Sequence, residues 1–373
     1  MHAMNLLKMK IAQWAQECGF SRLGIATLQE NSEGFHLFHK WIQKGLHGEM
    51  SYLERGLEKR RNPSLILENA QSVLVFAVDY RQGISPDENH RSHFISRYAW
   101  GNDYHSLIQS KLESLKKKLV SEFPSEHFLS YVDTGPIQEK YWAALAGLGW
   151  MGKHTNLIHL KDGSYFFLAV LLTSLKIEPD TILSNHCGKC QACIDICPTQ
   201  AIIAPYLLDA RLCISYLTIE FKGVIPLSLR KKIGTHVFGC DDCQEVCPWN
   251  KHARLPESFL KNTSVDELHD YLALTSAEFK KRFFNTSILR SKRRGFLRNV
   301  CVVLGNIQDP SSIPHLDKAL NDEEALVRGH AAWALGQFEL SSVKEILYKR
   351  LEFEEEQWVR EEIEKSFEDR SLL

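Results

Sequence analysis

Residues 187–198 read CGKCQACIDICP, and residues 240–248 read CDDCQEVCP. The first stretch has cysteine gaps of two, two and three residues and then a proline, which is typical of bacterial ferredoxins. The second stretch repeats the later half of that pattern, and Cys213 lies upstream of it. Eight of the ten cysteines of the chain therefore gather between Cys187 and Cys247, and they predict two [4Fe-4S] clusters.

The spacing also predicts which cysteines share a cluster. In such a run, three neighbouring thiolates bind one cluster and the fourth cysteine binds the other. The first predicted ligand set is Cys187, Cys190, Cys193 and Cys247, and the second is Cys197, Cys213, Cys240 and Cys243. Disulfides are the disfavoured alternative because no export signal opens the sequence. Zinc knuckles would not require the third close cysteine or the Cys-Pro endings.

Length and composition indicate a soluble globular protein of two or three domains. The chain has 373 residues, 44% of them hydrophobic and 24% charged. The longest apolar run, residues 165–173, is far shorter than the roughly 20 residues that span a bilayer. We therefore expect a cytoplasmic protein without a membrane-spanning segment. Cys18 and Cys301 lie on apolar helix faces and are expected in the core.

Hydrophobic periodicity divides the chain into three segments. Residues 1–174 mix helical and strand patterns, which predicts an α/β or α+β domain. The expected helices are 5–17 and 104–120, and the expected strands are 72–80, 128–132 and 165–173. Residues 175–255 hold the cysteines, and there metal would substitute for an apolar core.

Residues 256–373 are helical and weakly repetitive. The pattern of residues 297–306 recurs at 327–337 and faintly at 359–367, which favours stacked helix pairs of the HEAT kind over an irregular helical bundle.

A basic stretch lies at the start of the helical segment. It contains eight cations and no acidic residue: Lys280, Lys281, Arg282, Arg290, Lys292, Arg293, Arg294 and Arg298. Such a run is most often a solvated helix face, but the lack of counter-charges also favours a polyanionic partner. The aromatic rings of Phe283, Phe284 and Phe296 are expected in the core.

Three further stretches closely resemble the epoxyqueuosine reductase family. They are RYAWGNDYH (97–105), YVDTGPIQEKYWAALAGLGWMGKHTNL (131–157) and FGCDDCQEVCPWN (238–250). The resemblance implies an α+β multidomain protein. Its domains would be an α/β cobalamin-binding domain (1–174), a ferredoxin-like two-cluster module (175–255) and an all-α HEAT-like repeat domain (256–373).

The resemblance also implies a reaction and its partners. Members of the family reduce the epoxide of epoxyqueuosine, at the wobble position of tRNA, to the alkene of queuosine. The implied cofactors are cobalamin and two [4Fe-4S] clusters. The implied partners are tRNA carrying epoxyqueuosine and an external one-electron donor of the flavodoxin or ferredoxin type.

Site residues follow from the same resemblance. Asp133 is marked as the proton donor, although read alone it would be a turn or capping residue before a helix that begins at Pro136. The implied cobalamin contacts are Arg60, Asp133, Lys153, His154, Thr155, Asn156, Asp241 and Asp242. The alternatives are a solvated arginine at Arg60, a helix C-cap at residues 147–155 and a turn cap at residues 241–242. The basic stretch 280–298 would face tRNA phosphates.

Two other functions compete with this interpretation. A reductive dehalogenase shares cobalamin and two clusters, but such enzymes typically begin with a twin-arginine export signal and lack a helical tRNA-facing tail. The second alternative is a ferredoxin-type electron carrier on a repeat scaffold. Such a protein would bind the two clusters but would have no catalytic activity of its own.

Overall fold

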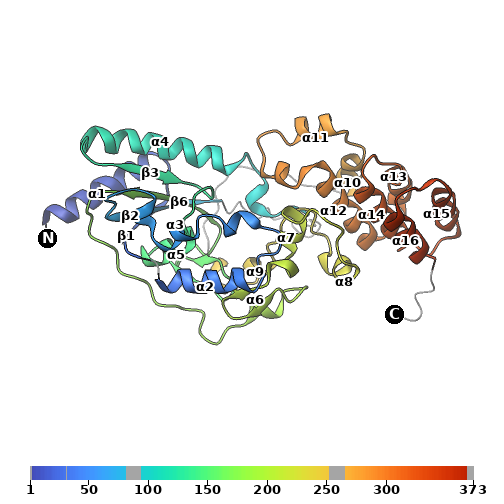
Figure 1. Cartoon of the computed structure of the whole chain (residues 1–373), viewed down its shortest axis with the longest axis horizontal. Helices are drawn as coiled ribbons and strands as arrows, with labels where there is room; N and C mark the ends of the chain where they lie inside the picture. Colours follow the sequence, from blue (N-terminus) through green and yellow to red (C-terminus); the bar gives the residue numbers. More distant parts are fainter. Residues whose placement is uncertain (1, 31, 81–93, 252–264, 368–373) are drawn as a thin grey trace. The chain divides into compact units, whose positions relative to one another are not determined.

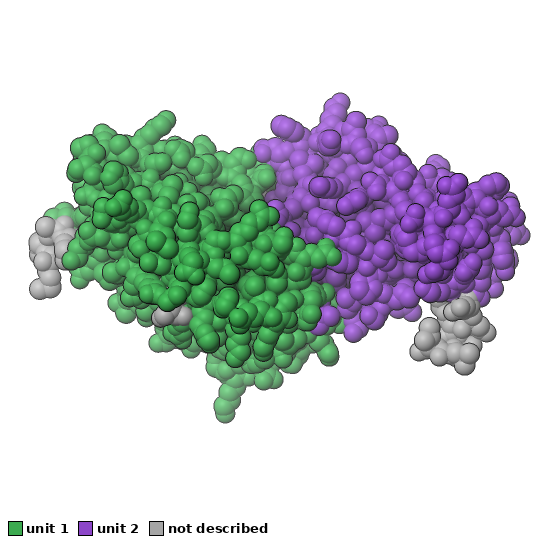
Figure 2. Space-filling model, viewed as in Figure 1, with its two compact units in different colours: residues 1–83, 101–211, 242–259 green, residues 84–100, 212–241, 260–373 purple. Residues whose placement is uncertain are grey.

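The computed structural model describes residues 2–30, 32–80, 94–251 and 265–367. It divides into two compact units, coloured separately in Figure 2. The first unit comprises residues 1–83, 101–211 and 242–259, and the second comprises residues 84–100, 212–241 and 260–373. This division splits the predicted module 175–255 between the two units. Its residues 175–211 and 242–255 belong to the first unit, and its residues 212–241 belong to the second. The three-domain boundaries therefore stay a prediction, and each unit is described by itself.

The first unit is built on a four-stranded sheet with the order β1-β2-β6-β3. The strands are β1 (Arg22–Thr27), β2 (Ser72–Asp79), β6 (Phe166–Thr173) and β3 (Phe128–Tyr131). Every neighbouring pair is antiparallel, and Leu74 of β2 lies opposite Ile25 and Leu171. The expected strands are confirmed, but the α/β label for this domain is wrong. An α/β domain requires parallel strands joined by crossover helices, so the first unit is α+β.

Helices cover both faces of this sheet, because alternate strand residues point to opposite sides (Figure 1). Leu74 and Phe76 pack beneath α1 (His2–Glu17) and α4 (Tyr104–Glu122), which confirm the two expected helices. Val73, Val75 and Ala77 pack on the other side against α5 (Glu139–Leu145). The apolar face of α5 is therefore fixed on the sheet.

One further helix of 12 residues, α2 (Ser32–Gln43), and several short elements complete the first unit. The short elements are α3 (Leu57–Arg61), β4 (Trp150–Met151), β5 (Leu157–Ile158), α6 (Ala192–Asp195), β7 (Ile202–Ala204), β8 (Leu207–Leu208) and α9 (Asp242–Glu245). Polar contacts hold the cysteine-bearing segments in place. The side chain of Asn250 accepts the N–H of Ser164 at 2.7 Å and donates to the carbonyl of Gln244 at 2.6 Å.

The second unit consists of helices. They are α7 (Ile214–Ile219), α8 (Leu227–Arg230), α10 (Val265–Leu272), α11 (Ser276–Arg282), α12 (Lys292–Ile307), α13 (Ile313–Ala319), α14 (Ala325–Leu335), α15 (Ser341–Phe353) and α16 (Gln357–Lys365). The three recurring sequence patterns lie on α12, α14 and α16, which pack one against the next. The predicted repeat arrangement is confirmed. Within the described residues, no helix is long and apolar enough to cross a membrane.

Arg298 on α12 is an internal residue of the second unit. Its side chain is fully buried, and its guanidinium donates to the carbonyls of Leu217, Gly223 and Phe221 at 2.6, 2.8 and 3.0 Å. The side chain of Asn299 donates to the carbonyls of Thr218 and Val237, both at 2.8 Å. The predicted contact of Arg298 with tRNA phosphates is therefore wrong. The N–H groups of its guanidinium donate to main-chain carbonyls that are buried beneath α12 and would otherwise have no hydrogen-bond donor.

We predict that Arg298→Met destabilises the second unit. Methionine fills a similar space but leaves three buried carbonyls without their donor, which costs about 3–5 kcal/mol. Chemical denaturation followed by circular dichroism should show a lower unfolding midpoint for the transition of this unit. The control is Arg294→Met, because Arg294 is exposed on the same helix and should shift stability by less than about 0.5 kcal/mol. Equal midpoints for the two variants would contradict the role given to Arg298.

Candidate active site and cluster ligands

Asp133 lies in the loop between β3 and α5. Its φ of +52° places it in the left-handed region, which is uncommon for a residue other than glycine and must be held by its surroundings. The hydroxyl of Tyr104 donates to the Asp133 carboxylate. Tyr104 is itself fixed by stacking on Phe167, with ring centroids 4.1 Å apart. The Asp133 side chain is exposed and is therefore accessible to a ligand.

The loop that contains Asp133 is three residues longer at its C-terminal end than the sequence predicted. The helix expected from Pro136 begins at Glu139, so the turn after Asp133 is longer. Gly135 packs on the ring of Tyr131, where a Cβ atom would approach a ring carbon to 2.3 Å. Only glycine fits this approach, and the loop is consequently held close to the end of β3.

Glu139 forms a carboxyl pair with Asp133. Its Oε1 atom accepts the main-chain N–H of Asp133 at 2.7 Å. Burial raises the pKa of Glu139 well above its ordinary value, and the charge of Asp133 raises it further, while the hydrogen bond from the Asp133 N–H opposes this shift. The sequence prediction did not include Glu139. The only sequence signal is its place inside the 131–157 stretch, six residues after Asp133.

Arg60 lies close to this pair. It is buried on α3, stacks over the ring of Phe38 at 5.5 Å and donates weakly to the Arg55 carbonyl at 3.4 Å. Burial lowers the pKa of Arg60, and the acidic groups of Tyr52 and Glu139 oppose this shift when they are ionised. The alternative of a solvated arginine is therefore wrong.

The glycine-rich loop follows α5 and contains the short hairpin of β4 and β5. Within it, His154 is buried, and its Nδ1 atom accepts the N–H of Asn156 at 3.1 Å. Burial lowers the pKa of His154 to about 4, so the ring is neutral at pH 7 and its hydrogen is on Nε2. That Nε2 atom is buried and finds no acceptor among the described residues. A buried donor without an acceptor fits a polar group of a bound ligand.

The other predicted loop residues have partners in the chain. The Lys153 ammonium donates to the carbonyls of Gly188 and Cys190, both at 2.8 Å, so it lies against the first cysteine loop. Thr155 has a φ of +66°. The ammonium of Lys140 donates to the Thr155 carbonyl at 3.2 Å and to the Asn156 side chain at 2.8 Å. The start of α5 thus contacts both loops of the candidate site, through Glu139 and Lys140.

The first predicted ligand set lies within the first unit. Burial raises the pKa of Cys193 to about 11, and the neighbouring charges of Cys247, Cys187 and Cys190 raise it as well. These thiols are therefore close enough to repel one another as thiolates, and none forms a disulfide. Iron bound at this place would stabilise the thiolate form, so the four residues fit a [4Fe-4S] cluster.

The second predicted ligand set is divided between the units. In the first unit, the Sγ atom of Cys197 accepts the N–H of Ala201 at 3.3 Å, and Cys243 lies on α9. In the second unit, Cys213 directly precedes α7, and the Sγ atom of Cys240 lies 3.8 Å from Nε2 of His236. The shared cluster of these four residues stays a prediction.

Asp241 and Asp242 have different local roles. Asp241 is buried and accepts hydrogen bonds from the Ser96 hydroxyl and from the Arg97 N–H, the latter at 2.8 Å. Asp242 is the first residue of α9. Asp241 therefore supports the turn at residues 96–97, and a cofactor contact for either aspartate stays a prediction.

Part of the basic stretch is paired with acids from other segments. Arg282 pairs with Glu267, Arg290 with Glu220 and Arg293 with Asp322. Four exposed cations of the stretch have no ion pair to a described residue, and we call them the basic surface: Lys280, Lys281, Lys292 and Arg294. The sequence suggested that the whole stretch lacks acidic partners. The structure shows that this holds for only part of it.

Two residues near the basic surface differ from expectation. Phe284 is 78% exposed, so its prediction as a core residue is wrong, whereas Phe283 and Phe296 are buried as expected. Lys222, outside the stretch, lies near it. Burial lowers the pKa of Lys222, and the charges of neighbouring cations, which include Lys292, lower it further. The negative charge of Glu220 opposes this shift.

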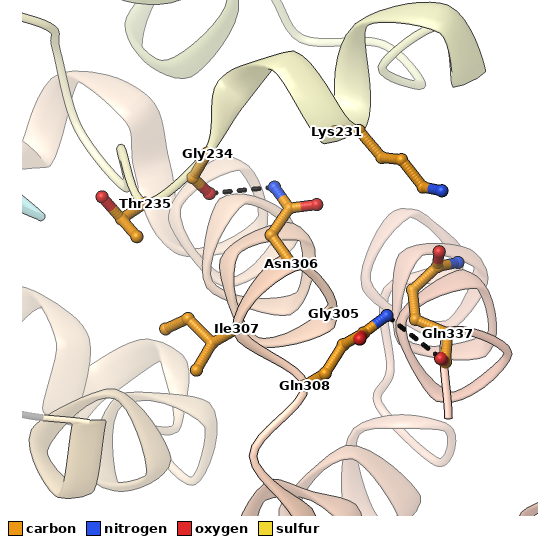
Figure 3. Close-up of a pocket in the computed structure, with 8 residues that line it drawn as sticks. All are labelled: Lys231, Gly234, Thr235, Gly305, Asn306, Ile307, Gln308 and Gln337. Carbon is orange, nitrogen blue, oxygen red and sulfur yellow. Dashed lines mark hydrogen bonds between the residues drawn. The ribbon is translucent and has the colours of Figure 1, made fainter. Parts of the chain in front are cut away.

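A pocket of about 360 Å³ lies in the second unit, at the ends of α12 and α14 (Figure 3). The side chain of Asn306 donates to the Gly234 carbonyl, and that of Gln308 donates to the Gln337 carbonyl. None of the predicted site residues lines this pocket. It is therefore separate from the candidate site around Asp133.

Comparison with protein families finds three matches along the chain. Residues 60–134 match the family described as epoxyqueuosine reductase QueG. Residues 186–250 match the 4Fe-4S double cluster binding domain, and residues 285–368 match HEAT repeats. The predicted clusters and helical repeats are each supported by a family of their own.

Curated relatives match over most of the chain. Epoxyqueuosine reductase of Pseudomonas aeruginosa is 41% identical over 346 residues, which cover 88% of this chain and 94% of the relative. Epoxyqueuosine reductase of Escherichia coli is 38% identical over 342 residues, which cover 90% of each chain.

Solved structures agree with the fold. A crystal structure of epoxyqueuosine reductase with an epoxyqueuosine-modified stem loop of tyrosine tRNA has a TM-score of 0.89 and 31% identity, covering 97% of this chain and 98% of that chain. The Bacillus subtilis epoxyqueuosine reductase, with its catalytic aspartate loop swung out of the active site, has a TM-score of 0.88, 31% identity and the same coverage.

We predict that Cys193→Ser removes one cluster and leaves the other. Anaerobically reconstituted protein should then hold about four iron atoms per chain, instead of the about eight expected for two cubane clusters. Iron and sulfide analysis with electron paramagnetic resonance measures this. Cys18→Ser is the control, because Cys18 packs against the apolar core and should leave the iron content unchanged. An unchanged iron content in Cys193→Ser would contradict the ligand assignment.

Proposed function

The chain belongs to the epoxyqueuosine reductase family, and from this premise we propose that it reduces epoxyqueuosine in tRNA to queuosine with cobalamin and electrons from two [4Fe-4S] clusters. The observation that carries the proposal is the geometry of Asp133. An accessible carboxyl group is held in a strained loop by Tyr104 and Glu139, beside a loop that presents a buried donor without an acceptor.

The residues of the first unit fit a large polar cofactor. His154 offers its Nε2–H, and Arg60 offers a buried guanidinium next to the carboxyl pair. Thr155 and Asn156 extend the same loop, and Lys153 and Asp242 complete the contacts proposed within this unit. Asp241 belongs to the second unit, and its proposed contact rests on the family resemblance alone. Cobalamin, when bound, supplies the reducing equivalents at the carbon atoms of the epoxide.

The chain contributes thiols for electron supply. Cys187, Cys190, Cys193 and Cys247 hold the first proposed cluster, while Cys197, Cys213, Cys240 and Cys243 hold the second, an assignment that rests on the sequence pattern. The clusters supply single-electron transfer, and the proposed electron source is an external carrier of the flavodoxin or ferredoxin type.

Asp133 performs the acid step of the proposed reaction. When a carbon–oxygen bond of the epoxide breaks, negative charge develops on the oxygen atom. A carboxyl group that donates its proton at that moment lowers the barrier by general acid catalysis. The Tyr104 hydroxyl orients the Asp133 carboxyl group, and the Glu139 contact to the Asp133 N–H positions the loop.

The second unit offers a surface for tRNA. The exposed cations of the basic surface would contact phosphates and release counterions. The exposed ring of Phe284 lies in the same stretch, and it would stack on an unpaired base, as aromatic residues do in loop recognition. The relative solved with a modified tRNA stem loop supports this partner.

We predict that Asp133→Asn strongly lowers turnover while iron content is retained. Asparagine keeps the size of the side chain but has no acidic proton, so the rate should fall by about 100-fold or more. Anaerobic incubation with cobalamin, a reductant and tRNA bearing the epoxide, followed by nucleoside analysis, measures the product. Queuosine formation at the wild-type rate would overturn the role of Asp133. An absence of a corrin absorption band in the wild type would favour the electron-carrier alternative.

We predict that the double variant Lys280→Ala and Lys281→Ala weakens tRNA binding and makes it less dependent on salt. Two lost phosphate contacts reduce the slope of log affinity against log salt concentration by roughly 1.4 to 1.8. The measurement is a titration with a labelled anticodon stem loop at several salt concentrations. A matched control replaces Lys344 and Lys349, which are exposed on α15. Equal slopes for both double variants would place the RNA elsewhere.

A further inference from the structure

The proposed reaction needs more protons than Asp133 alone holds. Conversion of an epoxide to an alkene breaks two carbon–oxygen bonds, consumes two electrons and two protons, and releases the oxygen as water. A single carboxyl group delivers one proton in each protonation cycle. A second proton must therefore reach the same oxygen atom during the reaction.

Resting on the proposed function, we propose that Glu139 is a positioning residue for Asp133 that also returns a proton to it between the two bond-breaking steps. Glu139 does not need to touch the substrate for this role. It acts through Asp133, which remains the group that faces the epoxide.

The contacts of Glu139 suit both parts of this role. Its Oε1 atom accepts the Asp133 N–H at 2.7 Å, which helps to hold the left-handed conformation of Asp133. The same contact places the Glu139 carboxyl group beside that of Asp133, whose charge raises the pKa of Glu139, and this proximity gives the proton its route. Glu139 is partly shielded from solvent, whereas Asp133 is exposed. The pair thus has an inner carboxyl group and an outer one.

The charged groups around the pair are consistent with a proton held on Glu139. The raised pKa of Glu139 keeps its carboxyl group protonated at a pH where an ordinary glutamate is ionised. Tyr104 donates to Asp133, and the ammonium of Lys140 is engaged with the glycine-rich loop. The Arg60 charge favours the ionised state of Glu139, and it would stabilise the negative charge that remains once the protons have been delivered.

The proton transfers balance in three steps. As the first carbon–oxygen bond breaks, the Asp133 O–H proton moves to the oxygen, which becomes a hydroxyl group. The Glu139 O–H proton then moves to the Asp133 carboxylate. As the second carbon–oxygen bond breaks, that proton moves to the departing hydroxyl group, and water leaves. Two electrons come from the one-electron carrier, and the two carboxylates recover their protons from solvent after product release.

Glu139→Gln separates the proton role from the positioning role. A glutamine side chain still offers an oxygen to the Asp133 N–H but holds no acidic proton. We expect kcat for epoxide reduction to fall by about 10- to 100-fold, with KM for the RNA changed by less than about twofold. Glu139→Ala removes both the oxygen acceptor and the acidic proton, so its kcat should be lower still. Glu139→Asp keeps an acidic proton, so its kcat should lie between those of Glu139→Gln and the wild type. Glu122→Gln, an exposed glutamate on α4, is the matched control.

The pH profile gives a second measurement. Turnover requires protonated carboxyl groups, so kcat in the wild type should fall as pH rises through the upper pKa of the pair. In Glu139→Gln this falling limb should move to lower pH, because the variant lacks the carboxyl group whose pKa burial raises. Wild-type kcat and an unmoved limb in Glu139→Gln would overturn the proton role, and Glu139 would then be an anchor for the loop alone.

Infrared titration of the full chain tests the pair without turnover. The wild type at neutral pH should show a protonated carboxyl band that Glu139→Gln lacks and Glu122→Gln retains. Absence of this band from the wild type would overturn the inference even if epoxyqueuosine is reduced. Presence of the band in a wild type that forms no queuosine would instead count against the proposed function.

Discussion

The burial of α5 against the sheet is the contact on which the candidate site depends. Trp142 and Ala143 are fully buried among strand residues such as Val73 and Val75, so the helix has one position on the sheet. Its first two residues are then placed by that packing. Glu139 contacts the Asp133 loop, and Lys140 contacts the glycine-rich loop. An apolar contact thus fixes the geometry of a polar site, since side chains on rigid elements keep their relative positions.

Polar contacts take the place of an apolar core around the cysteines. Helices and strands there are only two to six residues long, and side chains such as Asn250 and Lys153 hold the loops through main-chain groups. Burial raises the pKa of Cys193, and the neighbouring thiols raise it further, so the thiolate form is costly there without a metal. Cluster binding and local folding are therefore expected to be coupled in this region.

Burial separates two kinds of arginine within the basic stretch. Arg298 and Arg294 lie four residues apart on α12, yet one is fully buried and the other is exposed. The buried guanidinium serves main-chain carbonyls, and the exposed one remains available for a partner. Sequence composition gives both residues the same charge, and only their position on the packed helix distinguishes them.

The sequence by itself determined the cluster cysteines, the strands, the repeat helices and the family, because these depend on spacing and periodicity within short segments. It predicted Asp133 through the family resemblance but gave no sign of its contact with Glu139. It also predicted an exposed Arg298 and a buried Phe284, whereas Arg298 is buried and Phe284 is exposed. The tertiary structure alone decided the antiparallel order of the sheet, the counter-charges of Arg290 and Arg293, and the pairing of the two carboxyl groups. The physical reason is that each of these features depends on which distant segments pack together, and on how much water that packing excludes.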